Sequence, residues 1–211
     1  MRRARRLVAR VAAGYAIAVV AFHLFTFGLV LVTRLLGHDP RSDELATVHN
    51  LRQVDEQVFA GAQPHPDQYD ELARGGVHLV IDLRTGARDD PREDDPARLA
   101  AMGIDYLHLP VKDGHVPSPE TVRRLVDAID GADGLVYVHC GGGVGRSAAA
   151  QAAYVDARGD EPSWMALASL GPMSLEQLWF VADHRTNPVV RRVSEALDAP
   201  RRLWSRIGGW W

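Results

Sequence analysis

The stretch "VYVHCGGGVGRSAAAQAAYV", residues 136–155, decides the fold of this chain. A β-branched apolar run leads into a turn with four glycines, and an alanine-rich segment follows. The apolar run predicts a buried strand, and the alanines predict a helix that begins near Arg146. The only cysteine of the chain, Cys140, stands where the strand enters the turn.

The same alternation of strand and helix patterns continues on both sides of this stretch. Strand-like runs lie at 57–61, 77–83, 104–109 and 135–139. Helix patterns lie at 66–75, 96–102, 119–130, 146–158, 174–183 and 188–198. For the helix at 119–130, Ser118 is the predicted N-cap and Pro119 the first helical residue. Strands separated by helices predict an α/β fold with a largely parallel sheet.

Composition limits the classes of protein that this chain can represent. At 211 residues and 46% hydrophobic content, it can form one compact domain with an appended segment. A single cysteine excludes an internal disulfide framework and a structural zinc site built on thiolates. The first 38 residues hold six arginines and no acidic residue, which leaves a net charge of −9 on the remainder. We therefore expect no nucleic-acid partner, since binding to phosphate backbones needs a basic surface.

The N-terminal segment predicts a membrane anchor. Residues 11–32 carry no charge, and 22 residues at ~1.5 Å per residue match the ~30 Å hydrocarbon core of a bilayer. A cleaved signal peptide is the alternative, but the run is longer than a usual h-region. Five arginines precede the span, so we expect a cytoplasmic N-terminus and a domain on the opposite side. At the other end, "RRLWSRIGGWW" (201–211) either lies on the bilayer or caps the core.

The glycine turn has the chemistry of an oxyanion site. Glycines let successive backbone N–H groups turn inward, and the helix N-terminus adds partial positive charge. The predicted phosphate-binding residues are Gly141, Gly142, Gly143, Val144, Gly145 and Arg146. The same field favours the thiolate of Cys140, which makes it a nucleophile. Arg146 can hold two phosphoryl oxygens at once, and Ser147 places a hydroxyl near the sulfur.

The motif "HCGGGVGRS" (139–147) resembles the H-C-x5-R-[ST] signature of the cysteine-dependent protein tyrosine and dual-specificity phosphatases. Walker and dinucleotide-binding loops fit poorly, because Arg146 stands where they need lysine or glycine. "VFAGAQPHPDQYDEL" (58–72) is similar to the opening of compact bacterial and mitochondrial members. The resemblance covers roughly 51–184 and implies a three-layer domain whose chemistry needs no metal and no cofactor.

The resemblance also implies an acid upstream of the cysteine. "LPVKD" (109–113) looks like the family's acid loop and offers Asp113, 27 residues before Cys140. A plain turn aspartate in "KDG" is the alternative interpretation. His115 is a weaker candidate, since a histidine in such a loop is usually solvated. "VIDLR" (80–84) looks like a family strand, so Asp82 and Arg84 are expected to support the site, as is His139.

The sequence therefore predicts that the chain has four parts. They are a basic segment with the transmembrane helix (1–36), a linker (37–50), the catalytic domain (51–184) and an Arg/Trp-rich tail (185–211). The predicted function is hydrolysis of phosphotyrosine, phosphoserine or phosphothreonine, or a small phosphomonoester, through a cysteinyl-phosphate. A phosphoresidue-binding module on the same fold, and a phosphatase of a phosphorylated lipid or metabolite, remain open. A rhodanese-like sulfurtransferase would make no use of Asp113.

Overall fold

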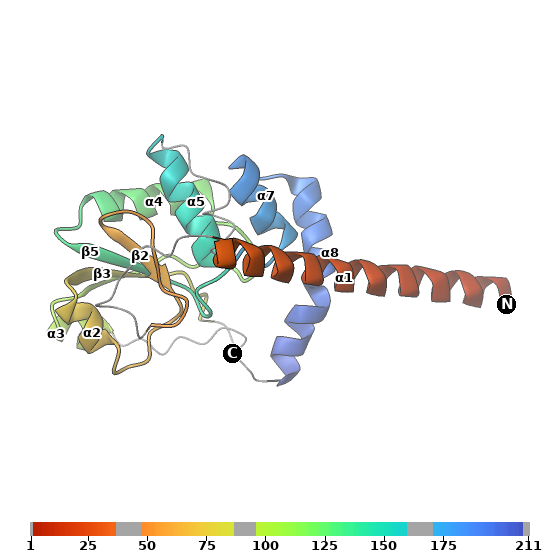
Figure 1. Cartoon of the computed structure of the whole chain (residues 1–211), viewed down its shortest axis with the longest axis horizontal. Helices are drawn as coiled ribbons and strands as arrows, with labels where there is room; N and C mark the ends of the chain where they lie inside the picture. The colour runs from red at the N-terminus through yellow and green to blue at the C-terminus, as the bar shows by residue number, and fades with distance from the viewer. Residues whose placement is uncertain (1, 37–47, 87–95, 160–170, 209–211) are drawn as a thin grey trace.

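The structure is a computed structural model that describes residues 2–36, 48–86, 96–159 and 171–208. Most of the predicted linker, the first part of the charged loop at 87–99 and the last three tail residues lie outside these ranges. The described chain folds as a sheet with helices on both faces, and one long helix extends away from this body (Figure 1).

The sheet has five strands in the order β1-β2-β5-β3-β4. The strands are β1 Arg52–Gln53, β2 Val58–Gly61, β3 Val77–Asp82, β4 Asp105–His108 and β5 Leu135–His139. All neighbours run parallel except β1 and β2. The predicted α/β fold with a largely parallel sheet is therefore confirmed, and the short β1 is an addition that the alternating pattern did not indicate.

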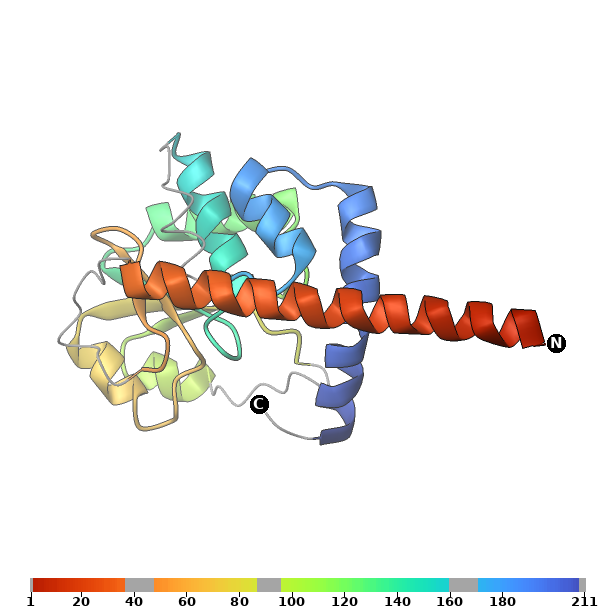
Figure 2. The same ribbon diagram turned by 45° about the vertical axis from the view of Figure 1, so that its right-hand side comes forward.

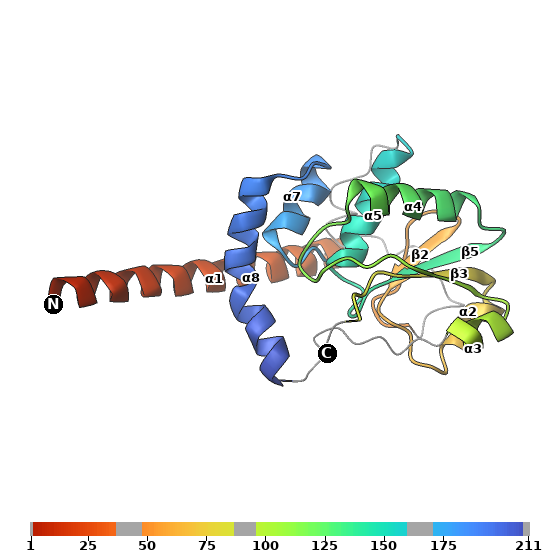
Figure 3. The same cartoon turned by 180° about the vertical axis from the view of Figure 1, so that it is seen from behind.

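Helices cover both faces of the sheet (Figures 1 and 3). One face carries α4 Pro119–Asp130 and α5 Arg146–Ala157, and the other carries α2 Tyr69–Arg74 and α3 Pro96–Ala101. Leu125, Ile129 and Tyr154 pack on the first face and Leu72 and Leu99 on the second, each with at most 1% of its surface exposed. Two separate cores thus hold the central strand β5 from both sides.

Strand register brings three chain segments to one edge of the sheet. His139, the last residue of β5, pairs with Gly61 on β2 and with Asp82 on β3. The carboxyl ends of these parallel strands therefore lie together, and ligand sites of open α/β sheets form at this edge. The glycine turn and the acid loop both start here.

Two further helices extend the layer that contains α5. Helix α7, Leu175–Asp183, packs against α5, and α8, Pro188–Gly208, packs against α7. The helical pattern predicted this helix only over 188–198. In the structure α8 continues past Pro200, which lacks the N–H that would bond to the carbonyl of Ala196, and the hydroxyl of Tyr15 donates to that carbonyl at 2.6 Å.

Helix α1, Arg2–Leu36, contains the predicted span. Its first half projects from the body, and its second half crosses α8 and lies against the domain (Figure 2). Residues Arg3–Leu29 are long and apolar enough to cross a membrane, a property that signal sequences share. The predicted helix over residues 11–32 is thus present within α1.

Candidate active site

The glycine turn, residues 140–145, connects β5 to α5 and is called the phosphate loop below. Cys140 opens it and is buried, with 2% of its surface exposed. Its Sγ lies 3.1 Å from the carbonyl oxygen of Val144, four residues further along. The sulfur therefore faces across its own loop, the position in which it would meet a bound anion.

Two glycines of the phosphate loop have backbone conformations that side chains disfavour. Gly143 and Gly145 have positive φ angles of 70° and 63°. A Cβ on Gly143 would lie 2.3 Å from the backbone nitrogen of Ala62, and one on Gly145 would lie 2.9 Å from Oε1 of Gln177, the end of a side chain that can shift. Backbone conformation and space both require glycine at 143, and backbone conformation favours it at 145.

Neighbouring segments bind the carbonyl groups at the start of the loop. The carbonyl of Gly141 accepts from the backbone N–H of Gln63 at 2.9 Å, and that of Gly142 accepts from Nδ2 of Asn50 at 2.7 Å. The N–H of Gly145 in turn donates to the carbonyl of Gly171 at 2.8 Å, so this group is already bonded. Contacts from three other segments therefore fix the backbone of the loop that is predicted to surround an anion.

The loop between β4 and α4, residues 109–118, is named the acid loop. Arg146, the first residue of α5, contacts this loop from the end of the phosphate loop. The side chain is buried, with Nη1 3.5 Å from the carbonyl of Val111. Its Nε lies 3.9 Å from Oδ1 of Asp113, whose side chain is 36% exposed. Two residues 33 positions apart in the sequence thus converge on one site.

Ser147 follows Arg146 in the first turn of α5. It is fully buried, and its hydroxyl has no hydrogen-bond partner within the residues that the structure describes. A buried hydroxyl without a partner is costly, so it is a group that a substrate or thiolate could satisfy.

Helix α7 holds the acid loop from behind. The hydroxyl of Ser174 donates to the carbonyl of Gly114 at 2.7 Å, and Nε2 of Gln177 donates to the carbonyl of His115 at 3.1 Å. Nδ1 of His115 lies 2.8 Å from Oε2 of Glu176. The expectation that His115 is solvated was wrong: it is 3% exposed, because α7 packs over the loop and supplies a carboxylate partner.

The predicted supporting residues lie in the interior beside the phosphate loop. Nε of Arg84 lies 3.1 Å from Oδ1 of Asp82 in a fully buried ion pair, and the hydroxyl of Tyr106 donates to Oδ2 at 2.7 Å. Burial raises the pKa of Asp82, but the charge of His139 and the Arg84 hydrogen bonds outweigh it, and the pKa falls to about 2. His139 is buried, with Nδ1 3.3 Å from the Cys140 carbonyl.

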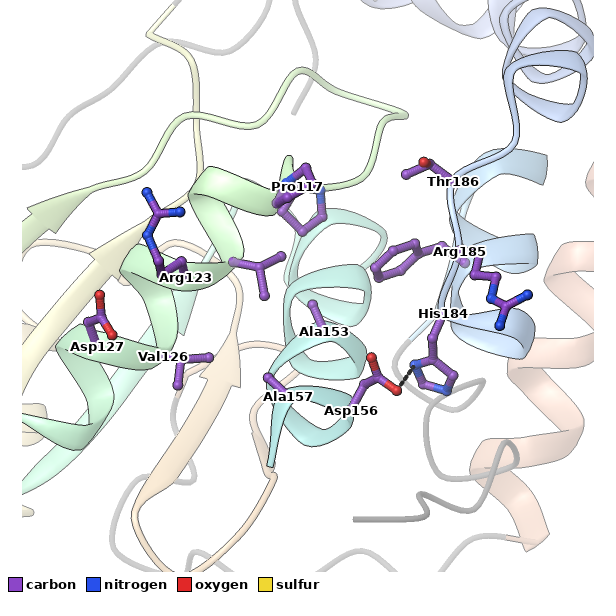
Figure 4. Close-up of a pocket in the computed structure, with 13 residues that line it drawn as sticks. Pro117, Arg123, Val126, Asp127, Ala153, Asp156, Ala157, His184, Arg185 and Thr186 are labelled. Carbon is purple, nitrogen blue, oxygen red and sulfur yellow. Dashed lines mark ion pairs between the residues drawn. The ribbon is translucent and has the colours of Figure 1, made fainter. Parts of the chain in front are cut away.

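A separate cavity of about 720 Å³ lies between α4, α5 and α7 (Figure 4). Phe180, Val126 and Ala153 form part of its apolar wall, and His184 lies 3.8 Å from Asp156 at its edge. No residue of the phosphate loop lines it. The candidate chemistry therefore belongs to the loop between β5 and α5 and not to this hollow.

Several residues of the site were not predicted from the sequence. Asn50 and Gln63 bind the phosphate loop, and Ser174 and Gln177 bind the acid loop. "SLEQ" (174–177) has the spacing of a helix capping box, and Ser174 does cap α7 by accepting from the N–H of Gln177. This signal marks the start of a helix, but nothing local indicates contact with a loop 60 residues away.

Comparison with known proteins places this geometry in a family. The family Tc-R-P, described as "Polymorphic toxin system, DSP-PTPase phosphatase", matches residues 55–160, half of the chain. The dual specificity protein phosphatase CDC14C of Homo sapiens is 33% identical over 73 residues, 35% of this chain and 16% of that protein. The match therefore spans well under two thirds of the human relative.

Solved structures share the fold. A DUF442 protein from Shewanella putrefaciens CN-32 has a TM-score of 0.54 and 23% identity, covering 76% of this chain and 98% of its own. The core catalytic domain of the PP-IP phosphatase SIW14 from S. cerevisiae has a TM-score of 0.52 and 12% identity, covering 74% and 94%. The family match, together with the H-C-x5-R-S loop, shows that the chain belongs to the dual-specificity phosphatase group of the cysteine-dependent protein tyrosine phosphatases.

Proposed function

We propose that this protein hydrolyses phosphomonoesters through a cysteinyl-phosphate intermediate. The main support for the proposal is the 3.9 Å distance between Nε of Arg146, the first residue of α5, and Oδ1 of Asp113 on the acid loop. It supports a site in which a nucleophile, a phosphate clamp and a proton donor act on one substrate.

The proposed reaction has two steps. The Cys140 thiolate attacks phosphorus, the bond from phosphorus to the leaving oxygen breaks, and Asp113 gives that oxygen its proton. Arg146 and the amides of the phosphate loop hold the phosphoryl oxygens, whose charge they neutralise in the transition state. Asp113, now a carboxylate, takes a proton from water, which attacks the cysteinyl-phosphate and releases inorganic phosphate and the free thiolate. Ser147 is proposed to donate to the sulfur as it leaves.

The proposed substrates are proteins with phosphotyrosine, phosphoserine or phosphothreonine. A stretch of 73 residues similar to a dual specificity protein phosphatase supports this class. The phosphate loop has no charged side chain before Arg146, which argues against a head group with several phosphates. A monophosphorylated lipid or metabolite remains the second candidate, which a panel of substrates separates from phosphopeptides.

The test is turnover of 4-nitrophenyl phosphate by the full-length protein in detergent, with a chelator present. We expect Cys140→Ser to abolish turnover and Asp113→Asn to lower it by roughly 10²-fold to 10⁴-fold. A wild-type protein that binds phosphopeptides without releasing phosphate would be a binding module instead. With thiosulfate and cyanide as substrates, transfer of the outer sulfur of thiosulfate to Cys140 with release of sulfite, and then to cyanide as thiocyanate, would indicate a sulfurtransferase if no phosphate is released from the aryl ester.

We also propose that α1 anchors the enzyme in a membrane, with the catalytic domain on the side opposite the N-terminus, an arrangement in which α1 gives up its contact with α8. Many large apolar side chains of α1 are exposed, an arrangement suited to lipid. They are Leu7, Val8, Val11, Ile17, Val20, Leu24, Phe25 and Phe27. Alkaline extraction of cell membranes and protease access to a C-terminal tag test the proposal. Recovery of a soluble protein shortened at its N-terminus would identify a signal sequence.

A further inference from the structure

The carboxylate of Asp113 has a second arginine partner besides Arg146. Nη1 of Arg201 lies 3.0 Å from Oδ2 of Asp113, while Nε of Arg146 lies 3.9 Å from Oδ1. The two oxygens of one carboxylate thus face different guanidinium groups. Arg201 belongs to α8, outside residues 55–160, so it comes from a part of the chain that the family match does not include.

Helix α8 packs closely against the acid loop at this point. A Cβ on Gly114 would lie 2.9 Å from Oδ2 of Asp198 and 3.4 Å from Nη2 of Arg201. Gly114 has a φ of 78°, and Asp198 is 1% exposed. The backbone of the loop and the side chains of α8 are therefore in direct contact, without space for an intervening residue.

The guanidinium of Arg201 lies between two carboxylates. Its Nε is 3.9 Å from Oδ1 of Asp198 on its own helix, and its Nη1 reaches Asp113 across the loop. Asp198, one turn earlier on α8, limits where the arginine can go. Only the contact with Asp113 is within hydrogen-bond distance, so this guanidinium, whose side chain is 30% exposed, presents its Nη1 donor to the acid.

This geometry matters most when a substrate is bound. The phosphoryl group then occupies the donors of Arg146, which leaves Arg201 as the cation that faces Asp113 within the described residues. Arg201 holds Oδ2 of Asp113, so the other oxygen, Oδ1, faces Arg146 and the phosphoryl group that Arg146 binds. Proton transfer to the leaving group requires that one oxygen be held within hydrogen-bond reach of it.

We propose that Arg201 is a positioning residue that holds Oδ2 of Asp113 and so directs Oδ1 toward the leaving group. The role rests on the proposed phosphatase function, since it has meaning only if Asp113 donates a proton. It acts in the step in which the bond from phosphorus to oxygen breaks, and the proton moves from Oδ1 to the departing oxygen. Arg201 itself exchanges no proton and forms no bond.

The test compares substrates that need the acid with substrates that do not. Phenyl phosphate has a basic leaving group that requires a proton, whereas 2,4-dinitrophenyl phosphate has a leaving group that departs as the anion. We expect Arg201→Ala in the full-length protein to lower kcat/KM about tenfold or more for phenyl phosphate and about twofold or less for the dinitrophenyl ester. Asp113→Asn should show the same pattern with a larger effect.

Three further variants make the test specific. Arg201→Lys keeps a donor and should recover part of the phenyl phosphate activity. Arg201→Ala in the Asp113→Asn background should cause no further loss, because the two residues act in one step. Arg192→Ala removes the same charge from an exposed position of α8 and should leave both substrates unchanged.

The possible outcomes separate the inference from the proposed function. Equal losses on both esters, no loss on either, or an added loss in the Asp113→Asn background would overturn the role of Arg201 alone. A wild-type protein inactive on both esters would overturn the proposed function and this role together. Thermal unfolding of each variant checks that the altered rates come from a folded protein.

Discussion

The phosphate loop and the acid loop meet at Arg146, but contacts of different kinds hold them in place. Glycines with positive φ, the end of β5 and the start of α5 give the phosphate loop its conformation, and its distant partners Asn50 and Gln63 bind only its carbonyl groups. The acid loop depends on the side chains of Ser174, Gln177 and Arg201, each at least 60 residues from the loop residue that it contacts. The conformation around the nucleophile is therefore largely encoded in its own stretch of sequence, while the acid depends on side chains of distant helices.

This difference suits the chemistry of the two loops. The phosphate loop must surround an anion in the same way in every turnover, and a backbone that allows only glycine provides that rigidity. The acid must lie beside the leaving group, and side-chain contacts from α7 and α8 hold it in place. Changes at Ser174 and Arg201 should therefore alter proton donation before they alter phosphate binding.

The largest expected effect tests the rigidity of the phosphate loop. Gly143→Ala places a methyl group against the backbone nitrogen of Ala62 and strains the backbone, so we expect a loss of ~3 kcal/mol in unfolding free energy. Gly142→Ala is the matched control, since its Cβ would meet Val144 at an ordinary 3.6 Å. Chemical denaturation measures both, and equal losses would mean that the positive φ angle is not what holds the loop.

A smaller effect tests how α7 supports the acid loop. Ser174→Ala removes the cap of α7 and the donor to the carbonyl of Gly114, for a loss of ~2–3 kcal/mol. Ser118→Ala removes a cap at the exposed start of α4 and should cost ~1 kcal/mol. Chemical denaturation measures the unfolding free energy of both variants. Only Ser174→Ala should also slow hydrolysis of phenyl phosphate, and a similar slowing by Ser118→Ala would show that the acid loop does not depend on α7 in particular.

Acid pH tests the interior beside the phosphate loop. The folded pKa of Asp82 is about 2, below its ordinary value of 3.8, so the unfolded state binds more protons between these values. Stability from this group is therefore present above pH ~4 and is lost as the pH falls toward 2, by about 2 kcal/mol. Unfolding free energies measured between pH 5 and pH 2 should show this decrease, and the decrease should be smaller in Asp82→Asn.

The smallest effect concerns the contact between α8 and the acid loop. Burial raises the pKa of Asp198, although Arg201 and Arg202 oppose the shift. The folded state holds this proton more tightly than the unfolded state, so the stability from this group is lost as the pH rises above ~4. We expect Asp198→Asn to raise the unfolding temperature slightly at pH 7. A lower unfolding temperature would mean that its ion pair with Arg201 outweighs the burial.

The sequence was most informative where chemistry and local structure coincide. The glycine turn between a β-branched run and an alanine-rich helix predicted the strand, the loop and the helix start at Arg146, and the structure has all three. Ser118 and Pro119 marked the start of α4 correctly. Local steric and hydrogen-bonding preferences act over a few residues, so a short stretch of sequence contains enough information to reveal them.

The oxyanion chemistry of the phosphate loop could also be predicted from its residues. The contacts around the acid could not, because they depend on how the helices pack. His115 is buried against Glu176 and Asp113 is paired with Arg201 because α7 and α8 fold back over the acid loop. The Ala196 carbonyl, whose helical partner Pro200 removes, likewise accepts from the hydroxyl of Tyr15, 181 residues away. Such contacts leave no local pattern, since each side chain would be equally acceptable on a solvated surface until the helices pack.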